Sequence, residues 1–161
     1  MSSRQYTVYV AEDDEDDIET LVAAFKYVDC SVAVHCYSTA AAMIRQLSPS
    51  VGTTLPDLIL LDHHLQYHTG VDLVGFITGQ ERFNSIALVI YATVLQETKK
   101  NDLLRVGVDC LLVKGNTLHD VREHVKTFCA VMMEKKRSTA AGKDGTALIE
   151  RKQNDTRGQR L

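Results

Sequence analysis

The stretch from residue 6 to residue 21 constrains the fold of this chain more than any other. It opens with an apolar run rich in β-branched and aromatic residues, which ends at Ala11. Residues 12–17 are all Asp or Glu, and apolar side chains then recur from Ile18 at the i, i+3, i+4 and i+7 spacing of a helix. A buried strand therefore passes directly into a helix, with the acids at the junction. In open α/β sheets this edge, at the carboxyl ends of the strands, is where ligands bind.

The acids at this junction repel one another. Two unit charges roughly 4 Å apart interact by about 1 kcal/mol in water and by about 4 kcal/mol at an effective dielectric constant near 20. The helix dipole offsets about 0.3–1 kcal/mol per acid in the first turn, which accounts for residues 14–17. Glu12 and Asp13 precede that turn and lie closer to the sheet, where a hard divalent cation would relieve the repulsion. Mg²⁺ is commonly held by one or two carboxylates together with waters and phosphate.

The rest of the chain alternates between strand-like and helix-like segments. The run DLILLD at residues 57–62 is continuously apolar between polar ends, which is typical of strands buried on both faces of a parallel sheet. Five strands alternating with five helices imply right-handed crossovers. We therefore predict an α/β fold, a flavodoxin-like five-stranded parallel sheet in the order 2-1-3-4-5 with five helices on both faces. The predicted strands are residues 5–11, 31–37, 57–62, 86–92 and 109–113, and the predicted helices are residues 14–27, 38–47, 71–79, 95–106 and a last helix from about residue 117.

A sheet of this order brings the ends of its strands together. It places Glu12, Asp13 and Asp62 around one crevice, and Lys114 reaches in from the tip of the fifth strand. Three carboxylates facing one ammonium suggest a bound cation and a transferred phosphoryl group, because an aspartate can act as a nucleophile and form an aspartyl phosphate. Mg²⁺ and a lysine would then neutralise the phosphoryl oxygens. Taken singly, Asp62 could merely cap a strand and Lys114 could be a surface lysine; their joint spacing favours a site.

Several motifs of this chain occur together in one known family. They are VAEDD at residues 10–14, PDLILLD at residues 56–62, VIYAT at residues 89–93 and GVDCLLVK at residues 107–114, together with Gly70. Over roughly residues 6–133 the chain resembles the receiver domains of two-component response regulators, including the single-domain chemotaxis regulator. The resemblance implies that Asp62 is the phospho-accepting aspartate and that Mg²⁺ is its cofactor. It further implies metal ligation by Glu12, Asp13, Asp62 and the backbone carbonyl of His64, and phosphate binding by Lys114, with Ala92, Thr93 and His63 beside it.

One departure from the family pattern concerns the hydroxyl residue at the end of the fourth strand. That position aligns with Ala92, and Thr93 follows it. Thr93 could substitute only if the strand end shifted by one residue, which would turn its side chain to the other face of the sheet.

Two further departures lie in the fifth strand and just after it. The aromatic residue that usually responds to the hydroxyl is Leu111, and the proline that usually follows the lysine is Gly115. A cis peptide without proline costs about 2.5–4 kcal/mol, so we expect a trans bond there. We hypothesise that Asp62 is phosphorylated but that signalling to residues 95–113 is weak or rewired.

Three histidines, His63, His64 and His68, follow the acceptor and raise the alternative of a transition-metal site. The other groups at this site are hard oxygens, so we favour three histidines on an exposed loop. His64 is then expected to tune the access of water to the acyl phosphate.

The composition changes after Glu134. Residues 135–161 carry eight Lys or Arg and three acids, a net of +5, whereas residues 1–134 carry a net of −8. We predict a receiver domain at residues 1–134 and a basic, disordered tail at residues 135–161, because the tail has too little apolar surface to order it alone. A second reading is a tether for an acidic partner, in which residues 147–151 form a short helix on contact.

The leading functional prediction is a single-domain response regulator of a two-component phosphorelay, a phospho-acceptor rather than an enzyme. Asp62 would take its phosphoryl group from a phosphohistidine on a sensor histidine kinase or a histidine phosphotransfer protein. Output would be contact with an unknown downstream protein or onward phosphotransfer, since no DNA-binding domain has room to fold after Glu134. We expect a cytoplasmic protein without membrane contact, because the chain shows no signal peptide and no apolar run long enough to span a bilayer. Its four cysteines also lack paired metal-ligand spacing and read as reduced thiols.

Two rival functions remain open at this stage. Ala92 and Leu111 motivate a degenerate receiver that acts as a phosphorylation-independent interaction or homodimerisation module. A Mg²⁺-dependent phosphatase with an Asp nucleophile is the weaker rival. It would need a second acid two residues after Asp62 as general acid, and His64 occupies that position.

Overall fold

The computed structural model describes residues 5–28, 30–48, 54–68 and 72–155, with side chains described except for residues 66–68 and 143–155. Its five strands form one parallel sheet in the order β2-β1-β3-β4-β5, which confirms the predicted fold class. The strands are β1 (Tyr6–Ala11), β2 (Val32–Tyr37), β3 (Leu58–Asp62), β4 (Ala87–Ala92) and β5 (Cys110–Val113).

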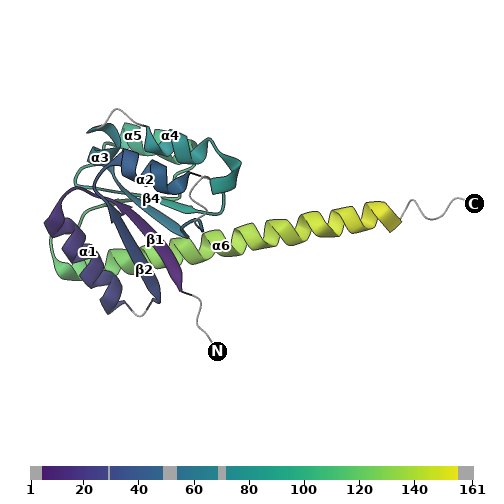
Figure 1. Cartoon of the computed structure of the whole chain (residues 1–161), viewed down its shortest axis with the longest axis horizontal. Helices are drawn as coiled ribbons and strands as arrows, with labels where there is room; N and C mark the ends of the chain where they lie inside the picture. Colours follow the sequence, from purple (N-terminus) through teal and green to yellow (C-terminus); the bar gives the residue numbers. More distant parts are fainter. Residues whose placement is uncertain (1–4, 29, 49–53, 69–71, 156–161) are drawn as a thin grey trace, which may run out of the picture.

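Helices cover both faces of the sheet (Figure 1). On one face lie α1 (Glu15–Tyr27) and α6 (Leu118–Asp155). The other face carries α2 (Ala40–Leu47), α3 (His63–His68), α4 (Leu73–Thr78), the 3₁₀ turn η2 (Glu81–Phe83) and α5 (Glu97–Arg105).

The helix count differs from the prediction of five. The described residues contain six α-helices and one 3₁₀ turn, because the segment directly after β3 forms α3 instead of a loop. Gly70, which the motif comparison included, and Val71, where a helix was predicted to begin, lie outside the described residues.

The core consists of two apolar layers separated by the sheet. Alternate strand residues point to opposite faces, so Leu60 packs under α1 and α6 while Leu61 packs under the helices of the other face. Every residue of β3 and β4 is buried, which explains why these strands read as continuous apolar runs. Each fully buried Leu or Ile contributes about 1.5–3 kcal/mol to stability. Burial of β3 and β4 therefore stabilises the middle of the sheet, between β1 and β5.

The final helix is longer than the sequence predicted. Residues 135–155 belong to α6, where a disordered tail was expected, although the domain division at residue 134 stays a prediction. The segment contains Lys, Arg, Glu and Ala, which favour helix, and extending an existing helix needs no new nucleus. The helix projects beyond the sheet (Figure 1). None of the helices in the described part of the chain combines the length and apolar character that a membrane span requires.

Candidate functional site

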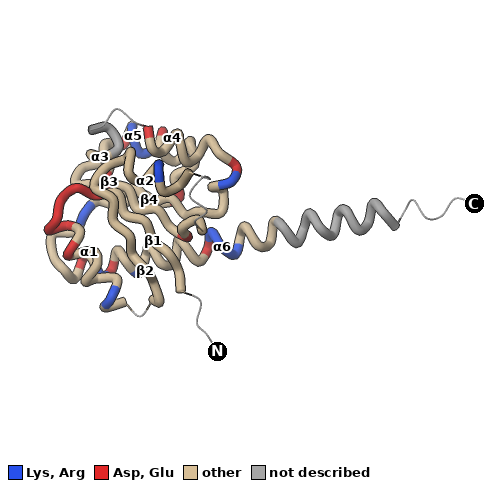
Figure 2. Tube along the Cα trace, in the orientation of Figure 1, with Lys and Arg blue, Asp and Glu red and all other residues tan. Residues whose placement is uncertain are grey.

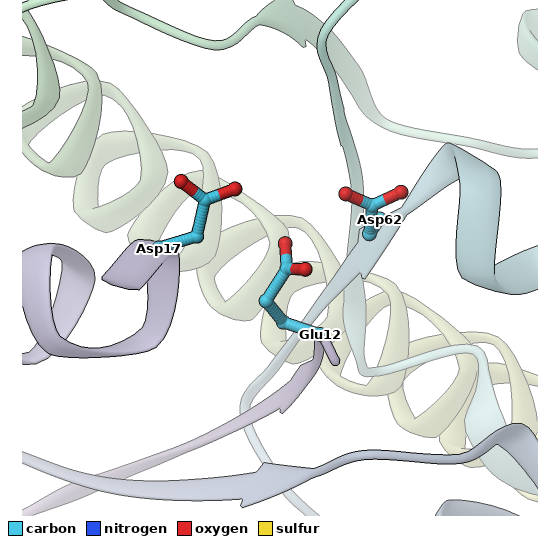
Figure 3. Close-up of side chains that lie close together, drawn as sticks. All are labelled: Glu12, Asp17 and Asp62. Carbon is cyan, nitrogen blue, oxygen red and sulfur yellow. The ribbon is translucent and has the colours of Figure 1, made fainter. Parts of the chain in front are cut away.

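The carboxyl ends of β1, β3 and β5 meet at a cluster of charged side chains. The ammonium of Lys114, directly after β5, donates hydrogen bonds to Glu12 (2.7 Å), Asp17 (2.6 Å) and Asp62 (2.5 Å). Figure 2 shows the acidic run between β1 and the first turn of α1, and Figure 3 shows the three carboxylates lying close together. The predicted convergence of Asp62, Glu12 and Lys114 is therefore present in the structure.

Local backbone structure fixes two of these carboxylates. Glu12 is 3% exposed at the tip of β1, and its Oε1 accepts the N–H groups of Asp13 (3.1 Å) and Asp14 (3.0 Å). Asp17 lies in the first turn of α1, where its N–H is capped by the side chain of Asp14. The acids after β1 therefore start the helix and at the same time supply the site.

The third carboxylate, Asp62, ends β3 and caps the helix that follows. Its Oδ1 accepts the N–H groups of His64 (2.5 Å) and Leu65 (3.3 Å), which is the N-cap arrangement for α3. Its Oδ2 faces Lys114. Both oxygens of Asp62 therefore have protein partners. The residue is only 8% exposed, but it borders an open pocket.

Burial and the lysine set the protonation of this cluster. Burial raises the pKa of Glu12 to about 7, although the hydrogen bond from Lys114 acts in the opposite direction. Burial also acts to raise the pKa of Asp62, but the hydrogen bond and charge of Lys114 outweigh it and lower that pKa. The pKa of Lys114 is raised because its hydrogen bonds to the three carboxylates outweigh the cost of burial. One ammonium therefore sits among three acids, and the pKa values of Glu12 and Asp62 are shifted in opposite directions.

This donor set suits a hard cation. One oxygen from each of Glu12, Asp17 and Asp62 lies within 4.8 Å of the others, and among the described residues this is the one such acidic cluster. Carboxylate oxygens are the ligands that Mg²⁺ and Mn²⁺ prefer. The residues present therefore fit a divalent cation.

Asp13 does not belong to this cluster in the described part of the chain; it is exposed, and Asp17 takes its place. Sequence reasoning missed Asp17 because six consecutive acids look alike. The available signal was that Asp17 falls in the first turn of the predicted helix, directly after the end of the strand.

The histidines after β3 are arranged differently from the prediction. His64 lies in the first turn of α3, and its N–H, not its carbonyl, faces Asp62. Helical carbonyls point toward the C-terminus, so the predicted metal ligation by the His64 carbonyl is not seen in this conformation. His63 is half-buried, and burial lowers its pKa, with the charge of Lys99 adding to the effect.

Three of the four residues predicted to bind phosphate, His63, Ala92 and Thr93, border a pocket of about 400 Å³ that Asp62, His64 and Val94 also line. The fourth, Lys114, lines a different pocket beside α1 and α6. Ala92 is the last residue of β4 and is buried, while Thr93 lies beyond the strand and is exposed. The strand end is therefore not shifted by one residue, and a methyl group stands at the expected hydroxyl position. Leu111 packs on the same face of the sheet as Ala92. No cis peptide occurs among the described residues, as expected for Gly115.

Comparisons with known proteins agree with this architecture. No protein-family model matches the chain, and no curated protein matches it. The phosphorylated cyanobacterial phytochrome response regulator RcpA has 24% sequence identity and a TM-score of 0.66, over 77% of this chain and 91% of that one. The Mn²⁺-bound form of response regulator Rcp1 has 21% identity and a TM-score of 0.65, over 76% and 90%. A signal receiver domain from Vibrio parahaemolyticus has 17% identity and a TM-score of 0.68, over 86% and 98%.

These solved structures are response regulator receiver domains, and the chain has their fold. The match covers most of each of those chains, and it agrees with the resemblance that the sequence motifs indicated.

Proposed function

We propose that this chain is a phospho-accepting response regulator in which Asp62 receives a phosphoryl group from a phosphohistidine. The observation that carries the proposal is the contact of Asp62 with Lys114 at the sheet edge, beside Glu12 and Asp17. The donor would be a sensor histidine kinase or a histidine phosphotransfer protein. Output would be contact with another protein or onward phosphotransfer.

The chemistry follows from the groups at the site. A carboxylate oxygen of Asp62 attacks phosphorus, the P–N bond of the phosphohistidine breaks, and its electron pair returns to the imidazole, which takes up a proton from solvent. The Lys114 ammonium then pairs with a phosphoryl oxygen, and this contact replaces part of its contact with the acids. The open pocket beside Asp62 leaves room for the incoming group.

A divalent cation, with Mg²⁺ the first choice, would be held by Glu12 and Asp62 together with a third carboxylate. When bound, it would neutralise charge on the phosphoryl oxygens and on the clustered acids. The structure favours Asp17 as the third carboxylate, whereas the sequence resemblance favours Asp13. The Rcp1 structure contains Mn²⁺, which supports a divalent site in a protein of the same fold.

The direct test is to incubate the protein with acetyl phosphate and Mg²⁺ and to measure its intact mass. We expect one phosphoryl adduct that needs the metal and disappears in Asp62→Asn. Asp57→Asn is the matched control, because Asp57 is a buried acid just before the other end of β3. No adduct in the wild type, or an adduct that persists in Asp62→Asn, would refute the proposal. Steady turnover of a phosphomonoester would instead favour the phosphatase reading.

A second candidate is a receiver whose interactions do not depend on phosphorylation. The observation that favours it is Ala92, buried at the end of β4, with Leu111 packed on the same face. Neither side chain can form a hydrogen bond, so these two positions cannot respond to a phosphoryl group as the hydroxyl and aromatic residues of the family do. Equal partner binding by the wild type and Asp62→Asn would support this candidate.

A further inference from the structure

The site lysine is connected to the last helix through a buried tyrosine. The N–H of Gly115, next to Lys114, donates to the hydroxyl of Tyr91 (3.3 Å). That hydroxyl lies 3.0 Å from Nδ1 of His124, in the second turn of α6. Tyr91 is 3% exposed, whereas Gly115 and His124 are half-buried, so this polar path is centred on a buried side chain.

The path lies on the opposite face of the sheet from Ala92. Successive strand residues alternate, so Ala92 faces α2 to α5 while Tyr91 faces α1 and α6. The Tyr91 ring packs edge-on against His124 (5.6 Å between centroids) and Phe128 (5.3 Å). The end of β4 is therefore apolar toward one layer and hydrogen-bonded toward the other.

Gly115 also contacts the first turn of α6 directly. A Cβ atom at Gly115 would lie 2.3 Å from the Cβ of Asp120, so the two backbones approach as closely as glycine allows. Asp120 is itself fixed, because it exchanges hydrogen bonds with Thr117 in a capping box (3.0 and 3.1 Å). A displacement of Gly115 must therefore move the start of α6.

Near its middle, α6 is anchored at the opposite edge of the sheet. Lys135 and Lys136 form ion pairs with Asp109 (2.8 Å) and Asp57 (2.6 Å). Residues 118–136 extend about 28 Å at 1.5 Å per residue. Because α6 is one continuous helix, it links the site edge to its projecting segment.

We propose that Tyr91 and His124 couple occupancy of the carboxylate site to α6. This inference rests on the proposed function: a phosphoryl group on Asp62 draws the Lys114 ammonium away from Glu12 and Asp17, and Gly115 moves with it. The change reaches α6 through the Tyr91 hydroxyl and the contact with its first turn. The output face would then be α6, not the face that carries Ala92.

The test uses amide NMR of the full chain with and without beryllium trifluoride and Mg²⁺, a stable mimic of the phosphoryl group. In the wild type we expect shifts at residues 62–65 and 114, and further shifts over residues 118–128. In Tyr91→Phe, which keeps the ring and removes the hydroxyl, the first set should remain and the α6 set should be lost. Tyr37→Phe is the matched control, since Tyr37 packs in the other apolar layer.

His124 variants separate coupling from a purely structural role. His124→Leu should lose the α6 response, and His124→Asn, which keeps a polar group near the position of Nδ1, should restore it. An α6 response that survives in Tyr91→Phe, or wild-type shifts confined to the site, would overturn this inference alone. No shifts at residues 62–65 in the wild type would overturn the proposed function and this inference with it.

Discussion

Removing the site lysine should destabilise the protein in a way that depends on pH and on Mg²⁺. Lys114→Met leaves Glu12, Asp17 and Asp62 facing one another without a cation. Two carboxylates with oxygens within 4.8 Å repel by about 3 kcal/mol at an effective dielectric constant near 20. Asp17 is 43% exposed, so solvent screens its share, and the buried pair of Glu12 and Asp62 dominates. We expect a loss of about 3 kcal/mol in the free energy of unfolding at pH 8 without metal.

The loss should shrink as the pH falls. Burial already raises the pKa of Glu12 from 4.5 to about 7, and Lys114→Met removes a group that lowers it. The folded state then binds a proton that the unfolded chain has released, so the stability of the variant falls as the pH rises from about 4.5 to above 7. At pH 5, where Glu12 is protonated, the loss should be about 1 kcal/mol or less.

Urea unfolding at pH 5 and pH 8, with chelator and with Mg²⁺, measures these terms. A bound cation at 100 times its dissociation constant contributes about 2.7 kcal/mol, so saturating Mg²⁺ should recover most of the loss at pH 8. Lys100→Met, which removes the half-buried partner of the exposed Glu97, is the control and should cost less than about 1 kcal/mol at either pH. A Lys114→Met effect that is equal at both pH values and insensitive to Mg²⁺ would show that the three carboxylates are not electrostatically linked.

Four further variants test the surroundings of the site. Asp17→Asn should weaken Mg²⁺-dependent phosphorylation at least about tenfold, and Asp13→Asn should have a smaller effect. Both effects are measured by intact mass against Mg²⁺ concentration. A larger effect of Asp13→Asn would support Asp13, the ligand predicted from sequence. Gly115→Ala should lower the free energy of unfolding, measured in urea, by about 1–3 kcal/mol, because its Cβ would collide with Asp120. Wild-type stability would contradict the close approach. Thr117→Ala removes half of a capping box and should cost about 1 kcal/mol, with increased amide hydrogen exchange at the start of α6; unchanged exchange there would argue against the cap.

The sequence predicted the sheet well because its signals there are strong. Continuous apolar runs between polar ends located β3 and β4, and the alternation of strands and helices predicted a parallel sheet. The strand order was taken from the flavodoxin-like fold, and the structure confirms it. The meeting of Asp62, Glu12 and Lys114 needed no side-chain detail, since each residue lies at or directly after the end of a strand. The topology of a parallel sheet places the carboxyl ends of its strands at one edge, so these residues must meet there.

The features that were missed depend on local side-chain geometry. Asp17 reaches the lysine because of where it falls on the first turn of α1, which a run of six acids cannot reveal. The six-residue α3 has little apolar periodicity of its own, and it forms where the Asp62 side chain caps its first N–H groups. Asp62, predicted as the phosphoryl acceptor and as a metal ligand, therefore also starts a helix.

Because of this double role, a phosphoryl group on Asp62 would compete with contacts that its oxygens already make. While Asp62 caps α3 through Oδ1, its other oxygen is held by Lys114, so both oxygens have protein partners. A phosphoryl group bonded to either oxygen must weaken one of these contacts: the cap of α3 on one face, or the lysine that leads to Gly115 and α6 on the other. The methyl group of Ala92 offers no hydrogen bond on the first face, whereas Tyr91 offers one on the second. If Asp62 is phosphorylated as proposed, this balance of polar contacts favours a response through α6.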